Sequence, residues 1–111
     1  MDVRAFVDEL LPALADTEFF ERVTLQTEGP IASGYAYVHN EFYLRFYFNA
    51  VTGTTAFALI EIQRRIWGID YDNRRGWHLH PAESPTDHIE TNPMSIEDIV
   101  ANLQAVLSKR T

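Results

Sequence analysis

The chain contains no cysteine, so it can form neither a disulfide nor a thiolate metal site, and a bound metal would need imidazole, carboxylate or water ligands. No apolar run approaches the roughly 18 residues of a membrane-spanning helix, and the first four residues do not resemble a secretory signal. Lysine is nearly absent, and the net charge of −7 disfavours nucleic acid unless a local basic patch exists. We therefore expect a cytoplasmic protein without membrane attachment.

Several enzyme motifs are also missing. The sequence has no glycine-rich phosphate loop, no Gly-x-Ser-x-Gly elbow and no His-Glu-x-x-His helix, so the enzyme classes built on them are set aside. What is present is typical of a globular protein: 46% of the 111 residues are hydrophobic and 13% are aromatic. This length fits a single domain over residues 1–111 that buries a core of its own.

Helical periodicity marks the two ends of the chain. Apolar residues recur at helical spacing from Asp2 to Ala15, with Asp2 as the N-cap, and Pro12 should kink or shorten this helix. A second helix begins after Ser95, where Asp98 stands in the position of a capping-box acid. We expect both helices to pack through their apolar faces.

Between the helices the pattern changes to the alternation of strands. Turn residues separate six candidate strands: Arg22–Glu28, Gly34–Val38, Glu41–Asn49, Thr55–Ile62, Arg65–Asp72 and Trp77–His80. Short connections force neighbouring strands to be antiparallel. The sequence therefore predicts an α+β fold: a curved antiparallel meander of about six strands, with the N- and C-terminal helices on one face. Residues 81–94, which contain three prolines, are predicted to form a long loop.

Residues 70–80 concentrate the groups that can do chemistry. Asp70 and Asp72 alternate before a short loop, and His78 and His80 alternate after it, so each pair should project to one face of the sheet. Whether the two pairs share that face depends on the number of residues in the loop.

The turn chemistry favours a shared face. A three-residue loop over residues 74–76 ends on a glycine, which suits the left-handed position of the common three-residue hairpin. This loop places His78 opposite Asp72. It likewise places His80 opposite Asp70. A two-residue loop would send acids and histidines to opposite faces, and it would need positive φ at two arginines.

A shared face supports two kinds of chemistry. The side chains of Asp70, Asp72, His78 and His80 could act as acid–base catalysts, because histidine titrates near neutrality. Imidazole could instead hold a divalent cation through His78 and His80, with His88 as a third ligand. The alternative without a function is a set of solvated cross-strand ion pairs, each worth a few tenths of a kcal/mol.

Two arginine pairs flank the same strand. Arg74 and Arg75 stand at the hairpin tip beside Trp77, where they could hold a phosphate or stack on a base, or simply form an exposed turn. Arg64 and Arg65 lie at the other end of the strand, roughly 25–30 Å away at about 3.3 Å per residue. The four arginines therefore cannot form one phosphate-binding cluster.

The hairpin also resembles a known family. A Tyr-Asp-Asn motif that begins at Tyr71, followed by a His-x-His element and a proline, resembles the signature of the TumE-like proteins, small prokaryotic proteins known mostly as presumed toxins of toxin–antitoxin pairs. The resemblance covers about residues 35–107. Position by position, it marks Asp72, Asn73, Gly76, His78 and His80.

Three functions follow as hypotheses. The resemblance implies a cytoplasmic toxin-like protein with a small helix-turn-helix antitoxin as partner and with nucleic acid or the translation machinery as target. We expect it to act on RNA through Asp70, Asp72, His78 and His80. The hairpin residues themselves add Asn73, Arg74, Arg75 and Trp77 as binding residues, although an Arg-Arg pair departs from the family's pattern. The first alternative is a metal-binding or metal-dependent hydrolytic module that uses a divalent cation. The second is a non-catalytic domain that forms a homodimer through the sheet face or an edge strand.

Overall fold

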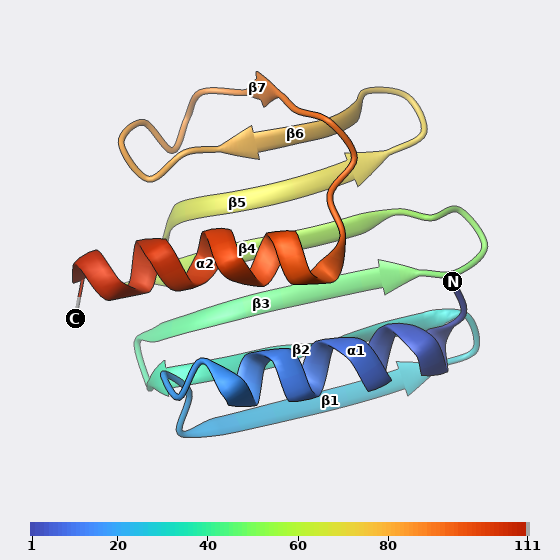
Figure 1. Ribbon diagram of the computed structural model, residues 1–111, viewed down its shortest axis with the longest axis horizontal. Coiled ribbons are helices and arrows are strands. Elements are labelled where there is room, and N and C mark those ends of the chain that lie inside the picture. The colour runs from blue at the N-terminus through green and yellow to red at the C-terminus, as the bar shows by residue number, and fades with distance from the viewer. Residues whose placement is uncertain (111) are drawn as a thin grey trace.

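One antiparallel sheet organises the molecule, and its strands follow one another in chain order (Figure 1). The computed structural model describes residues 1–110. Two helices and seven strands occur in the order α1 (Val3–Asp16), β1 (Arg22–Glu28), β2 (Ile31–His39), β3 (Phe42–Asn49), β4 (Thr55–Glu61), β5 (Arg64–Asp72), β6 (Gly76–His80), β7 (Ile89–Glu90) and α2 (Ile96–Arg110). The predicted α+β meander is confirmed, with one short strand more than expected.

The extra strand, β7, falls in the segment that was predicted to be a loop. Its two residues pair with β6, with Glu90 opposite His78 and Ile89 opposite Leu79. Two residues are too few for a hydrophobic period to show in the sequence, so this strand depends on the neighbour that it pairs with.

Both helices begin as the sequence predicts. The Asp2 side chain accepts the Ala5 N–H at 2.8 Å, and Ser95 and Asp98 cap α2 reciprocally, each accepting the other's backbone N–H at 3.1 and 3.3 Å. Pro12 does not shorten α1, which continues to Asp16. Pro12 lies on the exposed side of the helix, where water can satisfy the carbonyl that loses its partner.

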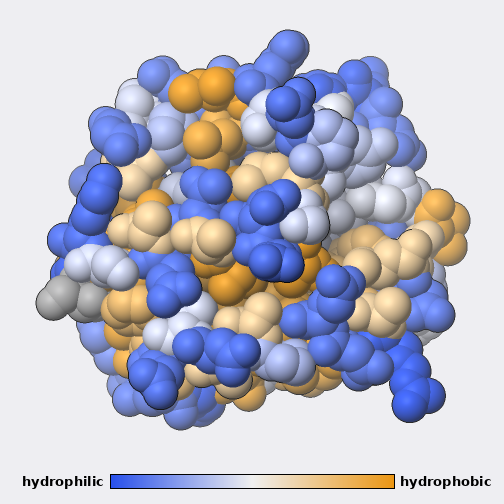
Figure 2. Space-filling model, in the orientation of Figure 1, coloured by the Kyte–Doolittle hydropathy of each residue, from blue (hydrophilic) through white to orange (hydrophobic). Residues whose placement is uncertain are grey.

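The core lies on the face of the sheet that both helices cover (Figure 1). Alternate residues of β3 supply its centre, and the Phe48 ring stacks on Phe6 of α1 with ring centroids 4.5 Å apart. On the helix side, hydrophilic residues cover much of the surface, and hydrophobic residues show between the two helices and at the edge near β6 and β7 (Figure 2). The buried side chains that meet there include Phe42, Leu44, Phe46, Phe57, Leu59, Trp67, Ile69, Leu10, Leu14, Ile99, Leu103 and Leu107.

No helix of residues 1–110 covers the opposite face of the sheet (Figure 1). Tyrosine rings cluster on it: Tyr35 stacks on Tyr37 with centroids 5.9 Å apart, and the ring of Tyr43 contacts both. Neither helix of residues 1–110 is long and apolar enough to cross a membrane. Because strand residues alternate between faces, Asp70, His78 and His80 belong to this uncovered side.

Candidate functional site: a histidine cluster beside a carboxylate

The β5–β6 hairpin brings the acid and histidine groups together, in a register that differs from the predicted one. Asp70 lies opposite His78, Gly68 lies opposite His80, and Asp72 lies opposite Gly76. The predicted pairing of His78 with Asp72 and of His80 with Asp70 is therefore wrong by two positions. A shift of two leaves the faces unchanged, so the prediction of a shared face for Asp70 and both histidines is confirmed.

The register differs because the Asp72 side chain starts the turn. Its Oδ1 accepts the backbone N–H groups of Arg74 at 2.9 Å and of Arg75 at 2.8 Å, which closes the loop over residues 73–75. These backbone donors, first Arg75 and then Arg74, lower the pKa of Asp72, and the Arg75 guanidinium lowers it further. Asp72, predicted to be catalytic, thus has its carboxylate engaged by the turn.

Gly76 closes the same hairpin in the left-handed conformation, with φ of +73°, and a Cβ there would meet nothing within 4 Å. Gly76→Ala should therefore lower the free energy of unfolding through backbone strain alone, by about 1 kcal/mol. Urea denaturation of Gly76→Ala and Gly76→Asn measures this, and the asparagine variant should lose less, because asparagine tolerates this conformation. An alanine variant as stable as the parent protein would contradict the strain.

The carboxylate of Asp70 lies between two buried imidazoles. Its Oδ2 is 3.1 Å from Nε2 of His80 and 3.5 Å from Nε2 of His78. The histidine side chains are only 2% and 7% exposed, whereas Asp70 keeps 27% of its side chain in solvent. Asp70 therefore lies on the side of the two buried histidines that faces the solvent.

A third imidazole reaches this group from the segment between β6 and β7. Turns at Pro81–Ser84 and Ser84–Asp87 fold the segment back, and pairing of β7 with β6 holds its end. The His88 ring then lies 4.4 Å from the His80 ring and 5.5 Å from the His78 ring, centroid to centroid. Each of the three histidines offers a nitrogen, and these nitrogens all lie within 4.8 Å of one another.

Arg65, an exposed residue of β5, contacts the buried His80. Its Nη2 lies 3.2 Å from Nδ1 of His80, and the Asp87 carbonyl oxygen lies 3.1 Å from the same nitrogen. Arginine can only donate and the carbonyl can only accept, so Nδ1 serves one of them at a time. Burial lowers the pKa of His80, and the nearby Arg65 charge lowers it further, whereas Asp70 raises it.

Arg65 was not among the predicted site residues. It was expected to form an arginine pair with Arg64, far from the hairpin tip. The sequence does hold a signal for it, a glycine inside a strand. A Cβ at Gly68 would lie 2.9 Å from the Phe57 carbonyl oxygen, 3.5 Å from the Arg65 side chain and 3.6 Å from the His80 ring. Gly68 thus leaves the space in which Arg65 and His80 meet.

The lowered pKa of His80 predicts how the stability of the metal-free protein changes with pH. In the unfolded chain His80 takes up a proton near pH 6.5, while in the folded protein it remains neutral to lower pH. The unfolded state then binds more protons, so stability is unaffected above about pH 7 and falls below it, by at most about 1.4 kcal/mol per pH unit for one proton.

Urea denaturation between pH 8 and pH 5 measures this fall. His80→Gln should flatten the profile, whereas His39→Gln, at an exposed position, should keep it. A parent protein that gains stability on acidification from pH 7 to pH 5 would contradict a lowered pKa.

The remaining predicted binding residues divide between the two faces. Arg74 and Arg75 line a hollow together with His78, His88 and Glu90. Trp77 packs against the core on the helical side, with its ring 5.2 Å from that of Tyr71. Asn73 accepts the Tyr71 hydroxyl at 3.2 Å. Trp77 and Asn73 are therefore separated from the histidines, and the two arginines are not.

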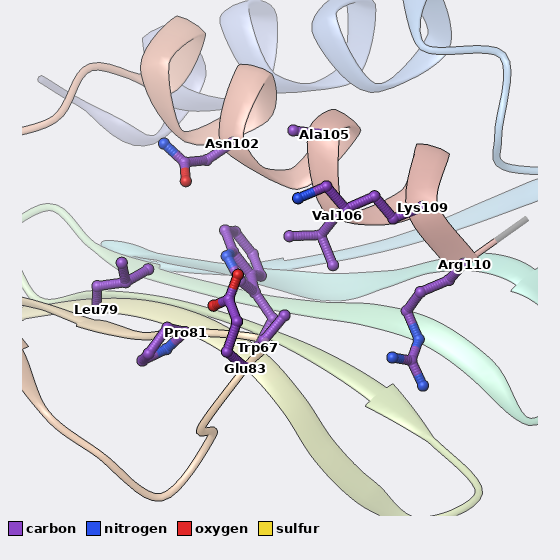
Figure 3. A pocket seen from close by; sticks show the side chains of 10 residues that line it. Trp67, Leu79, Pro81, Glu83, Asn102, Ala105, Val106, Lys109 and Arg110 are labelled. Atoms are coloured by element: carbon purple, nitrogen blue, oxygen red, sulfur yellow. The ribbon is translucent and has the colours of Figure 1, made fainter.

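A larger hollow, of about 560 Å³, lies on the helical face (Figure 3). The side chains of Trp67, Leu79 and Val106 form its apolar wall, and Glu83 and Lys109 stand at its rim (Figure 3). It has no cluster of histidines or carboxylates, so the chemistry of the described residues concentrates on the other side of the sheet.

The imidazole arrangement matches the ligand chemistry of a transition metal ion. Tetrahedral zinc with imidazole ligands at about 2.0–2.1 Å spaces those nitrogens roughly 3.3 Å apart, so the three histidine nitrogens, which lie within 4.8 Å of one another, would move closer together to share an ion. Three protein ligands leave a fourth position open for water or substrate. Comparisons of the chain with models of known protein families, with curated proteins and with solved structures find no match.

Proposed function

We propose that the protein binds a divalent transition metal ion through His78, His80 and His88. The observation that carries this proposal is the convergence of three imidazole nitrogens within 4.8 Å, two of them on buried side chains. Both buried histidines already have polar partners: the Gly76 carbonyl oxygen lies 3.4 Å from Nδ1 of His78, and the Asp87 carbonyl oxygen and Asp70 each lie 3.1 Å from a ring nitrogen of His80. A cation shared by the three imidazoles would in addition hold the segment before β7 against β6.

The donor set narrows the choice of metal. Imidazole ligands suit zinc, copper, nickel and iron, whereas magnesium and calcium prefer sets of oxygen ligands. Asp70 adds a negative charge beside the imidazoles, within 3.5 Å of Nε2 of both buried histidines. We take Zn²⁺ as the test ion because it readily accepts tetrahedral nitrogen and oxygen ligands.

Isothermal titration of metal-free protein with Zn²⁺, without an affinity tag, tests the proposal. We expect one ion per chain, and His88→Ala should weaken binding by at least about tenfold while leaving the sheet intact, because His88 is exposed and comes from a loop. His39→Ala serves as the matched control, since His39 lies on a different turn and should bind Zn²⁺ like the parent. No binding, or equal binding by the His88 and His39 variants, would overturn the proposal.

This geometry supports metal binding better than direct acid–base catalysis by the histidines. The His80 side chain is 2% exposed, so a substrate has little access to it. Burial also lowers the pKa of His80. We propose further that the site supports metal-dependent hydrolysis, in which the bound ion would activate a water molecule at its open coordination position. Hydrolytic turnover that requires the ion is its test.

The toxin-like role, with its cytoplasmic location, RNA target and helix-turn-helix antitoxin, stays a separate proposal supported by the hairpin motif. Its motif residues Asp72 and Gly76 shape the turn, and His78 and His80 belong to the histidine cluster. Expression in a bacterial host should arrest growth, and a His78→Ala variant should not. Growth of the parent strain equal to that of an empty vector would contradict the role.

A further inference from the structure

We infer that the metal site takes a small phosphorylated ligand, whose phosphate Arg74 and Arg75 hold beside the metal ion. The inference rests on the proposed metal binding and adds the class of ligand to it. Its basis is a hollow of about 410 Å³ lined by Arg74, Arg75, His78, His88 and Glu90. Two of the three proposed metal ligands form part of its wall, so a ligand in the hollow would lie beside the ion.

The turn holds the two arginines at this hollow. Asp72 accepts both of their backbone N–H groups and also the side-chain Nε of Arg75 at 3.2 Å. The terminal amino groups of Arg75 make no hydrogen bond within residues 1–110, and the Arg74 guanidinium likewise has no protein partner in that range. Planar guanidinium groups bind phosphate oxygens through paired hydrogen bonds, so these unused donors suit an oxyanion.

The charges in the hollow point the same way. Two guanidinium groups and a divalent cation would together outweigh the carboxylates of Glu90, Asp70 and Asp72, which leaves a net positive charge at this hollow in a chain whose net charge is −7. A phosphate monoester, which is close to a dianion at neutral pH, matches that pocket. A nucleic acid would also meet the acidic remainder of the surface, which repels a polyanion.

The size of the hollow favours a small ligand as well. Small-molecule pockets in proteins span about 300–1,000 Å³, and this one lies near the lower limit. It has room for a phosphate with a compact organic group, and the metal would contact the phosphate oxygens directly. The predicted phosphate-binding role of the hairpin tip thereby becomes part of the metal site.

Titration of the zinc-loaded protein with phenylphosphonate, which cannot be hydrolysed, tests the inference. We expect saturable binding that weakens at least tenfold when Zn²⁺ is removed. The double variant Arg74→Gln, Arg75→Gln should also lose at least tenfold in phenylphosphonate affinity while binding Zn²⁺ as the parent does, because the turn depends on backbone N–H groups that glutamine retains. Arg64→Gln, at an exposed position at the far end of β5, is the matched control and should bind phenylphosphonate normally.

The outcomes separate this inference from the proposed function. Absence of zinc binding overturns the metal site itself. Zinc binding without phenylphosphonate binding, or phenylphosphonate binding that the arginine substitutions leave unchanged, overturns only the phosphate site. A single-stranded RNA ten-mer that displaces phenylphosphonate at lower concentration than phenyl phosphate does would overturn the small ligand in favour of RNA.

Discussion

Saturating Zn²⁺ is expected to raise the melting temperature of the metal-free protein by about 10 °C or more. A ligand at 100 times its dissociation constant stabilises the folded state by about 2.7 kcal/mol. For a domain near 100 residues, each kcal/mol shifts the melting temperature by about 4–8 °C. The ion would join the loop before β7 to β6, two segments that otherwise meet through a two-residue strand and a few hydrogen bonds such as that between His80 and the Asp87 carbonyl. Thermal denaturation with and without Zn²⁺ measures the shift.

The controls for this shift are substitutions at two exposed histidines. His88→Ala removes a ligand and should lose most of the zinc-dependent gain, while its metal-free melting temperature stays close to that of the parent. His39→Ala should retain the full gain. A zinc-dependent shift of the same size in both variants would place the ion elsewhere.

Replacement of Trp67 by alanine has the second large expected effect. Trp67 is 1% exposed and lies opposite Leu59 at the centre of the sheet, on the side that α2 covers. Large-to-small changes at buried aromatic residues cost about 3–5 kcal/mol. Domains of this size have a total stability of about 5–15 kcal/mol, so the variant should melt far lower or remain partly unfolded.

Urea denaturation of Trp67→Ala beside Trp77→Ala isolates the effect of burial. Trp77 has the same side chain in a half-buried position near the hairpin tip, and its loss should be clearly smaller. Equal losses for the two variants would contradict the placement of Trp67 in the core.

The fold could be predicted because its signals are local and repeat along the chain. The alternation through β3, the capping residues Asp2 and Ser95, and the short connections each point to the same meander. What the sequence could not predict was β7, since two residues have no period. The predicted helix from Asp2 to Ala15 agrees with α1, and only the shortening expected at Pro12 is absent.

The site could be predicted only in part. Alternation placed Asp70, His78 and His80 on one face, but the exact register depended on the Asp72 side chain accepting two backbone N–H groups, a contact that alternation does not reveal. The contribution of Arg65 required a close approach at Gly68. Such contacts join segments through packing rather than through a sequence pattern.

The position of His88 shows the same limit. The sequence named it as a possible third ligand, yet nothing in the proline-rich segment determines where the loop carries it. Turns at Pro81–Ser84 and at Ser84–Asp87, followed by pairing with β6, bring its ring within 4.4 Å of His80. Whether His88 reaches the other two histidines therefore depends on the path of the segment between β6 and β7.

X-ray absorption spectroscopy of the zinc-loaded protein tests the central claim most directly. We expect coordinating nitrogen or oxygen atoms at about 2.0–2.1 Å with the multiple scattering of three imidazoles, reduced to two in His88→Ala. A spectrum that shows no imidazole scattering, or one that His88→Ala leaves unchanged, would contradict it.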